Sequence, residues 1–153
     1  IAIEQVRGDP PDRYWIRFTC RGIVTLINEQ PVYSDIHRVA IVLTNTFPTT
    51  QPLMEWLTPI FHPNIRPNGE EVCIGTWYPA KKLDRLVLML GEMVQYKNYA
   101  SHDPLYLEAS LWAMQHKELF PVDQRDLLNP QKSLPQTRSV DPTEERIDIQ
   151  LIR

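Results

Sequence analysis

The spacing of apolar residues changes once along this chain, and this change limits the folds that the chain can adopt. In the first half, apolar side chains alternate with polar ones in short stretches, as in residues 14–20 and 38–44. After Pro79 the spacing becomes three or four residues, at Leu83, Leu86, Val87, Leu90, Met93 and Val94. A period of two is typical of half-buried strands, and a period near 3.6 is typical of an amphipathic helix. This order predicts an α/β fold of the α+β type, in which an antiparallel sheet is followed by helices.

The predicted sheet is a four-stranded antiparallel meander. Its strands are expected at residues 14–20, 23–27, 38–44 and 53–57, with a turn at residues 28–31. Short connections of this kind favour hairpin neighbours. Residues 1–12 are too short for a full helix, so the end of a helix or a short strand is expected there. Cys20 falls on the same face as the aromatic residues and is expected in the core.

The second half predicts helices and an extended tail. After the helix at 83–94, Asp103 followed by Pro104 indicates an N-cap and first turn, and this second helix is expected to run to about Lys117. A further short helix is expected at residues 121–128. Residues 147–152 alternate in polarity, and we expect them to be able to add a strand to an edge of this sheet or a neighbour's.

Length and composition indicate one domain. The chain has 153 residues, 42% of them hydrophobic. We expect a domain at residues 1–128 and a C-terminal extension at residues 129–153. With a net charge of −3 and one small basic cluster, nucleic acid is not an expected partner. No apolar run or signal peptide points to a membrane, and two widely spaced cysteines suit a reducing compartment, so a cytoplasmic protein is predicted.

The most reactive residues lie at the two ends of a short loop, residues 61–73. Cys73 has no obvious base beside it, but a thiol needs little activation for exchange between thioesters. Such a site needs a donor for the oxyanion, and the side-chain amide of Asn64 is the candidate. The alternative is that Asn64 forms a turn and Cys73 is a buried strand residue.

Several motifs follow one another in a fixed order around this loop. They are Phe47-Pro48-Thr49-Thr50-Gln51-Pro52, Trp56-Leu57-Thr58-Pro59-Ile60-Phe61-His62-Pro63-Asn64-Ile65, Gly69, Cys73, Trp77-Tyr78-Pro79-Ala80 and Asp103-Pro104-Leu105. In these motifs, in their order and in the lengths between them, the chain resembles the ubiquitin-conjugating enzymes. The resemblance implies the family fold, a four-stranded meander followed by helices, with the first helix of the family short or missing here.

The resemblance also implies a role for each site residue. Cys73 would accept the C terminus of ubiquitin or a ubiquitin-like protein as a thioester. Asn64 would stabilise the oxyanion, or order the loop, when a target lysine attacks. Asp103 matches a position where many members carry an acidic residue beside the lysine, and helix capping is its alternative role. The residues expected to support the active-site loop are His62, Pro63 and Trp77.

The partners implied are an activating enzyme, the modifier, a substrate lysine and, for many members, a ligase. The residues expected to contact partners are Pro48, Thr49, Pro79 and Ala80. Thr49 is small and polar where many members place an aromatic residue that contacts a RING-type ligase, which argues against ordinary RING docking. The interval from Cys73 to Trp77 is shorter than usual, so Cys73 is expected to be exposed to larger partners. These departures indicate a divergent member, and we hypothesise a prokaryotic ubiquitin-like conjugation system.

Two other functions compete with this interpretation. One is a non-catalytic module of the same fold that binds a ubiquitin-like protein. Another is a thiol hydrolase in which Cys73 acts with His102 or His116 and with Asp103. A zinc site at His62 and Cys73 lacks further ligands at a suitable spacing. No metal or nucleotide cofactor is expected.

Overall fold

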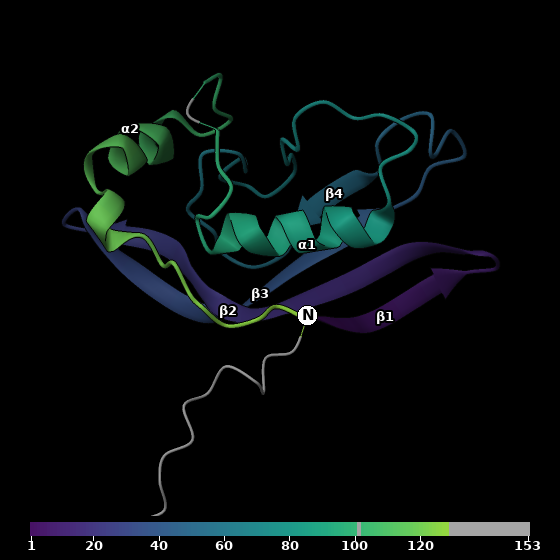
Figure 1. Ribbon diagram of the computed structural model, residues 1–153, viewed down its shortest axis with the longest axis horizontal. Helices are drawn as coiled ribbons and strands as arrows, with labels where there is room; N and C mark the ends of the chain where they lie inside the picture. Colours follow the sequence, from purple (N-terminus) through teal and green to yellow (C-terminus); the bar gives the residue numbers. More distant parts are fainter. Residues whose placement is uncertain (101, 129–153) are drawn as a thin grey trace, which may run out of the picture.

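A four-stranded antiparallel sheet forms the base of the protein (Figure 1). The structure, a computed structural model, describes residues 1–100 and 102–128. The strands are β1 (Ala2–Gly8), β2 (Pro11–Ile27), β3 (Gln30–Val42) and β4 (Leu53–Trp56). They lie in the order β1-β2-β3-β4, and each pairs with the next in antiparallel fashion. The predicted four-stranded meander is confirmed.

The division of the sheet into strands differs from the prediction. Residues 14–20 and 23–27 belong to one strand, β2, whose pairing with β3 shifts register between Thr19 and Gly22. Gly22 lies against Val94, where a Cβ would come within 2.5 Å of the Val94 side chain. The apparent break in the pattern is therefore a site of close packing inside a continuous strand. The missing strand is β1, so residues 1–12 include the short strand rather than the end of a helix.

Strand β3 begins earlier than predicted, directly after a turn that is also tighter than predicted. Asn28 and Glu29 both have positive φ, at 50° and 64°, and Ile27 pairs directly with Gln30. A two-residue turn of this kind matches the right-handed twist of the strands that it joins. The two long strands therefore form one hairpin that extends beyond the rest of the sheet.

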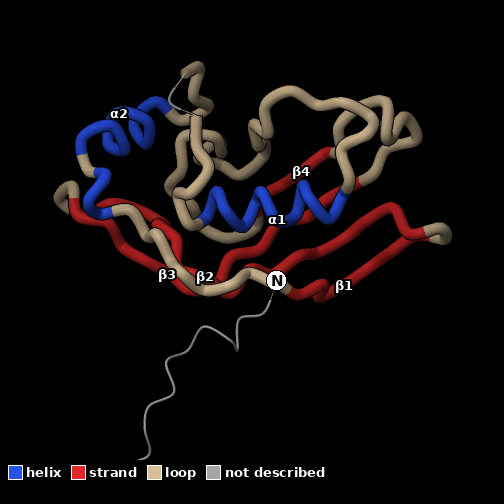
Figure 2. The backbone as a smooth tube through the Cα atoms, viewed as in Figure 1, coloured by secondary structure: helices blue, strands red, loops and turns tan. Residues whose placement is uncertain are grey.

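Helix α1 (Leu83–Val94) forms where the periodicity predicts it and covers one face of the sheet (Figure 2). Its buried side contains Leu86, Leu90, Met93 and Val94. These residues share the main core with Phe18 and Ile16 of β2. Helices begin only at Leu83 within the described residues, which agrees with the expected absence of a full N-terminal helix from this part of the chain.

The second helix starts later than predicted. Helix α2 spans Leu107–Gln115 with Tyr106 at its N-cap, and a short 3₁₀ helix follows at Lys117–Leu119. Asp103 has a φ of 52°, in the left-handed region, four residues before the helix. The prediction that Asp103 caps the helix is therefore wrong, because the chain still turns at that position.

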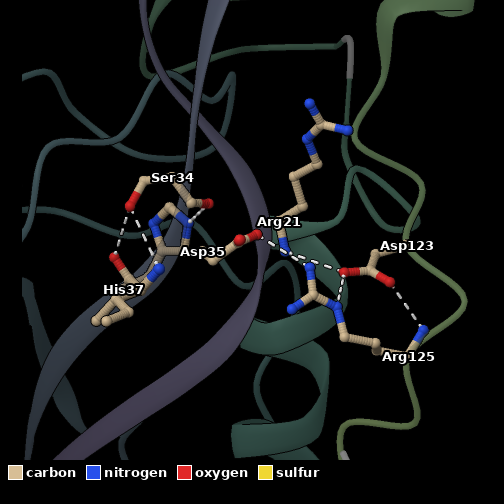
Figure 3. A network of polar contacts seen from close by, with 7 residues as sticks. Arg21, Ser34, Asp35, His37, Asp123 and Arg125 are labelled. Atoms are coloured by element: carbon tan, nitrogen blue, oxygen red, sulfur yellow. Dashed lines mark hydrogen bonds and ion pairs between the residues drawn. The ribbon is translucent and has the colours of Figure 1, made fainter. Parts of the chain in front are cut away.

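The predicted helix at residues 121–128 is also wrong. Residues 120–128 instead form an irregular segment, here called the C-terminal strap, that lies against the sheet (Figure 3). The Asp123 carboxylate accepts hydrogen bonds from the main-chain N–H groups of Arg21 and Arg125, at 3.2 and 2.9 Å. The Arg125 guanidinium pairs with Asp123 and reaches Asp35 of β3 at 2.9 Å. Polar contacts with the sheet thus take the place of helical hydrogen bonds.

The strap ends beside the N-terminus. The Ile1 ammonium group donates a hydrogen bond to the Leu127 carbonyl at 2.8 Å, and the Leu127 side chain is buried in the main core. The expectation for residues 147–152 concerns a segment outside the described residues.

A second, smaller cluster lies between α2 and the end of the β2–β3 hairpin. It contains Phe61, Tyr96 and Trp112, and the Trp112 indole donates to the Glu29 carbonyl at 3.1 Å. In the main core, Cys20 is fully buried, and burial raises the pKa of its thiol to about 12. The prediction that Cys20 is a core residue is confirmed.

Candidate active site

Main-chain hydrogen bonds bring Asn64 and Cys73 together. The Cys73 N–H donates to the Asn64 carbonyl at 2.8 Å, and Ile65 pairs with Val72 in an isolated antiparallel bridge. Ile65 and Val72 are both buried, which anchors the base of the loop in the core. Asn64 and Cys73 therefore lie opposite one another on two short segments that are joined by main-chain hydrogen bonds.

The far end of this loop is tied to the edge of the sheet. The Arg66 N–H donates to the Glu71 carbonyl at 2.9 Å, and their side chains form an ion pair. Gly69 has a φ of +80°, and its carbonyl accepts the Trp56 N–H at 2.8 Å. A Cβ at residue 69 would lie 2.2 Å from the Trp56 carbonyl oxygen, so this turn needs glycine.

The side-chain amide of Asn64 is oriented by the segment before α2. Its Oδ1 accepts the Ala100 N–H at 2.9 Å, and the residue is only 7% exposed. Among the described residues its NH₂ group has no hydrogen-bond partner. The oxygen of the amide is thus fixed, and Asn64 lines the same pocket as Cys73.

His62 holds the same turn from inside the protein. Its Nδ1 accepts the Asn64 N–H at 3.1 Å, and its ring meets the Tyr96 ring edge to face at 4.8 Å between centroids. Burial lowers the pKa of His62 to about 3, against a smaller opposing effect of the Asn98 backbone. The imidazole is therefore neutral, and it accepts a hydrogen bond from the local backbone. Pro63, also buried, accepts the Tyr106 N–H at 3.1 Å through its carbonyl.

Cys73 opens into a small pocket of about 130 Å³. The thiol is free and its residue is partly exposed. The lining residues are Asn64, Cys73, Ile74, Gly75, Met89, Met93, Asn98, Tyr99 and Ala100. None of these residues is a histidine, an aspartate or a glutamate. The pocket supplies amide and apolar groups but no side chain that could serve as a general base near neutral pH.

The other titratable candidates lie elsewhere. His102 and Asp103 are exposed and do not line this pocket. His116 follows α2 and lies 3.5 Å from a Glu118 carboxylate oxygen. The structure thus gives no support to a Cys–His pair for the hydrolase alternative. The described residues also contain no group of three or more metal-ligating side chains.

Trp77 joins two loops rather than lining the pocket. Its indole N–H donates to the Pro48 carbonyl at 2.9 Å, and its ring lies 6.0 Å from that of Phe47. The loop at residues 47–50 is thereby held next to the loop at residues 77–80. The residues predicted to contact partners are all exposed on these loops: Pro48, Thr49, Pro79 and Ala80.

Comparison with known proteins assigns the family. The profile of the family described as "Ubiquitin-conjugating enzyme" matches residues 16–127, well over half of the chain. The chain belongs to the ubiquitin-conjugating enzyme family. This match covers the whole region that holds Asn64, Cys73 and both exposed loops.

The relatives show that this ubiquitin-conjugating enzyme family member is divergent. The ubiquitin-conjugating enzymes E2 S of Drosophila ananassae and Drosophila melanogaster are each 34% identical over 107 residues, covering 58% of this chain and 46% of the relative. The chain therefore spans about half the length of these curated relatives. A ubiquitin-conjugating E2 domain from Toxoplasma gondii has a TM-score of 0.53 at 21% identity, covering 76% of this chain and 77% of that one, which supports the fold. The prokaryotic origin stays a prediction.

Sequence reasoning gave two parts of this family member's site no role and left a third open. Tyr99, for which a wall of the lysine channel was the alternative to the favoured core or surface position, lines the Cys73 pocket, whereas Tyr96 is buried and donates to the Phe61 carbonyl at 2.6 Å. Met89 lies one helical turn from Met93 and lines the pocket with it, a placement that the helical spacing of four residues could have suggested. Ala100 acts through its main-chain N–H, for which a sequence carries no signal.

No helix in the described part of this family member is long and apolar enough to cross a lipid bilayer.

Proposed function

We propose that Cys73 carries the C terminus of ubiquitin or a ubiquitin-like protein as a thioester and passes it to a lysine of a target protein. The observation that carries this proposal is the pairing of Cys73 with Asn64. Their main-chain hydrogen bond fixes the two residues, and the Ala100 N–H leaves the Asn64 NH₂ group free. A thiol beside an oriented amide donor, with no base in the pocket, suits thioester chemistry.

The first step loads Cys73. Its thiolate attacks the thioester carbonyl carbon of a modifier held by an activating enzyme, and the activating enzyme's thiolate leaves. One thioester bond forms as another breaks, so no oxidant, reductant or nucleotide is consumed on this chain. The exchange needs a free thiol, which suits the proposed cytoplasmic setting.

The second step transfers the modifier. The neutral amine of a target lysine attacks the carbonyl carbon of the Cys73 thioester, and the carbonyl oxygen becomes an oxyanion. The free NH₂ of Asn64 would donate a hydrogen bond to that oxyanion, which stabilises the transition state more than the uncharged thioester. The Cys73 thiolate then leaves, the amine proton passes to solvent, and an isopeptide bond remains.

The roles of the other predicted residues are more distant. Asp103 would act on the approaching lysine from outside the pocket, through its charge. The exposed loops braced by Trp77 would contact the activating enzyme and, where one is used, a ligase. The non-catalytic binding module is the competing function, and Cys73 in an open pocket favours the carrier function over it.

A charging assay tests the proposal. The protein is incubated with ATP, a candidate activating enzyme and its modifier, and the products are separated with and without a reducing agent. We expect a thiol-sensitive band heavier by one modifier, which disappears in Cys73→Ala and persists in Cys20→Ala, the buried control cysteine. Absence of the band with every modifier that charges its own activating enzyme would favour the binding module.

A further inference from the structure

An apolar groove lies where the first residues of the chain meet the start of helix α1. It has a volume of about 330 Å³, and its walls include Ile1, Ile3, Ile16, Leu83, Val87 and Leu128. Among the described residues that line it, Asp84 has the only charged side chain. Ile3 and Leu128 are 62% and 73% exposed, so large aliphatic side chains face solvent here. A surface of this composition is a typical docking site for apolar side chains.

The groove runs beside a free edge of the sheet. Strand β1 is the first strand in the sheet order and pairs only with β2. The outer side of β1 therefore presents main-chain N–H and C=O groups that no strand of the described chain pairs with. An extended segment placed there would gain main-chain hydrogen bonds from β1 and apolar contacts from the groove.

We propose that residues 147–152 of this chain occupy the groove as a fifth strand alongside β1. The described part of the chain ends at Leu128, which lies in the wall of the groove, and 25 residues follow it, from 129 to 153. A tether that starts at the binding site keeps its own C-terminal segment at a high local concentration. The position of Leu128 thus favours a segment of the same chain over a separate protein.

The sequence of the extension selects this segment. Residues 129–146 are mainly polar and contain several prolines, whereas residues 147–152 form the sequence Ile-Asp-Ile-Gln-Leu-Ile. In an extended strand, Ile147, Ile149 and Leu151 share one face, which would lie on the groove. The other face carries Asp148, Gln150 and Ile152 and would meet water. Arg146 and Arg153 bracket the segment, and their charge is opposite in sign to that of Asp84 in the groove.

The test compares amide hydrogen exchange in the full chain and in two variants with matched charge. Ile149→Asp with Leu151→Asp alters the face that would contact the groove, and Gln150→Asp with Ile152→Asp adds the same two charges on the opposite face. We expect exchange across Ala2–Gly8 to become at least tenfold faster in the first variant and to stay unchanged in the second. Exchange in the centres of β2 and β3 reports whether the domain itself remains folded.

Other outcomes would overturn the proposal. Equal exchange of β1 in the full chain and both variants would mean that the segment does not cover this edge. An equal increase in both variants would mean that the proposed face is wrong. Protection of β1 that grows with protein concentration would mean that the groove holds the segment of a second copy.

Discussion

The proposed role of Asn64 depends on the two ends of its side-chain amide, because the oxygen accepts a hydrogen bond and the nitrogen is the proposed donor to the oxyanion. The oxygen is held by the Ala100 N–H, and the nitrogen has no hydrogen-bond partner among the described residues in a residue that lines the Cys73 pocket. A rotated amide would present its oxygen to the developing oxyanion and repel it. The single hydrogen bond from Ala100 therefore selects the productive orientation.

Replacing Asn64 with alanine should separate the two chemical steps. Charging of Cys73 should continue, because thioester exchange relies on the thiol. Discharge to free lysine should fall by about 10²- to 10³-fold, the usual loss when one oxyanion donor is removed. Single-turnover discharge of the preformed thioester, followed on gels, measures this rate.

Asn98→Ala is the matched control, because Asn98 lines the same pocket and also carries a side-chain amide. It should discharge within a few-fold of the native rate. If Asn64→Ala discharges at the native rate as well, Asn64 has no oxyanion role and only shapes the loop.

For single residues, the sequence predicts contacts between residues that lie close together along the chain. A short loop brings together His62, Asn64 and Cys73. Its turns contain proline, asparagine and glycine, which favour turns, so the proximity of the three residues can be predicted from the sequence. Asp103 and Tyr99 depend on the irregular path between α1 and α2, which no periodicity describes. Sequence reasoning consequently placed Asp103 at a helix cap and favoured a core or surface position for Tyr99 over one at the lysine channel.

At the scale of structural elements, Trp77 makes two separate loops behave as one surface. One loop follows β3 and the other precedes α1, and the hydrogen bond from the Trp77 indole to the Pro48 carbonyl links them. Lys81 adds to this surface, with its ammonium 6.0 Å from the Trp77 ring and 5.7 Å from the ring of Tyr78. Tyr78 itself is 55% exposed. A partner that contacts either loop therefore meets both.

Trp77→Phe should loosen this link and leave the pocket intact. The ring contact with Phe47 can persist, while the hydrogen bond to Pro48 is lost, so the free energy of unfolding should fall by about 1 kcal/mol. Urea denaturation measures the fall, and discharge of the preformed Cys73 thioester to free lysine, which needs no activating enzyme, should keep the native rate. Tyr78→Phe, which changes an exposed aromatic on the same loop, should leave stability unchanged. A discharge defect in Trp77→Phe would instead indicate that Trp77 supports the active-site loop, as the sequence predicts.

Helices and strands were predicted more accurately where the spacing of their apolar residues is more regular. Helix α1 carries a continuous apolar stripe, and its bounds agree with the prediction. Helix α2 is apolar on more than one side, with Leu107, Leu111 and Met114 exposed, so its pattern fixed neither its start nor its contacts. The apolar residues of the C-terminal strap follow no regular spacing. Its conformation depends instead on Asp123 and Arg125, which bind distant strands. Such contacts can be found only once the sheet is known.

At the scale of the whole molecule, buried neutral histidines couple stability to pH. His62 lies beneath the active-site loop and His37 lies on β3, and both are fully buried. Burial lowers the pKa of His37, although its Nε2 lies 3.0 Å from the Ser34 carbonyl oxygen and that contact favours the charged form. Burial lowers the pKa of His62 to about 3. A proton on either imidazole would place a positive charge away from water, which is unfavourable.

The protein should therefore become less stable as pH falls below about 6.5, the ordinary pKa of histidine. In that range the unfolded chain binds a proton at each of these histidines and the folded chain does not, so acid favours unfolding. For His62 this loss continues towards its folded pKa of about 3, with a slope of up to about 1.4 kcal/mol per pH unit. Urea denaturation between pH 7 and pH 5 samples the effect before most carboxylates titrate.

His62→Gln should be less stable at pH 7, because its packing changes, but its stability should vary less steeply with pH. His102→Gln, at an exposed histidine, should retain the native slope. A native slope in His62→Gln would show that His62 takes up no extra proton on unfolding, and would remove the basis for treating it as a neutral acceptor beneath Asn64.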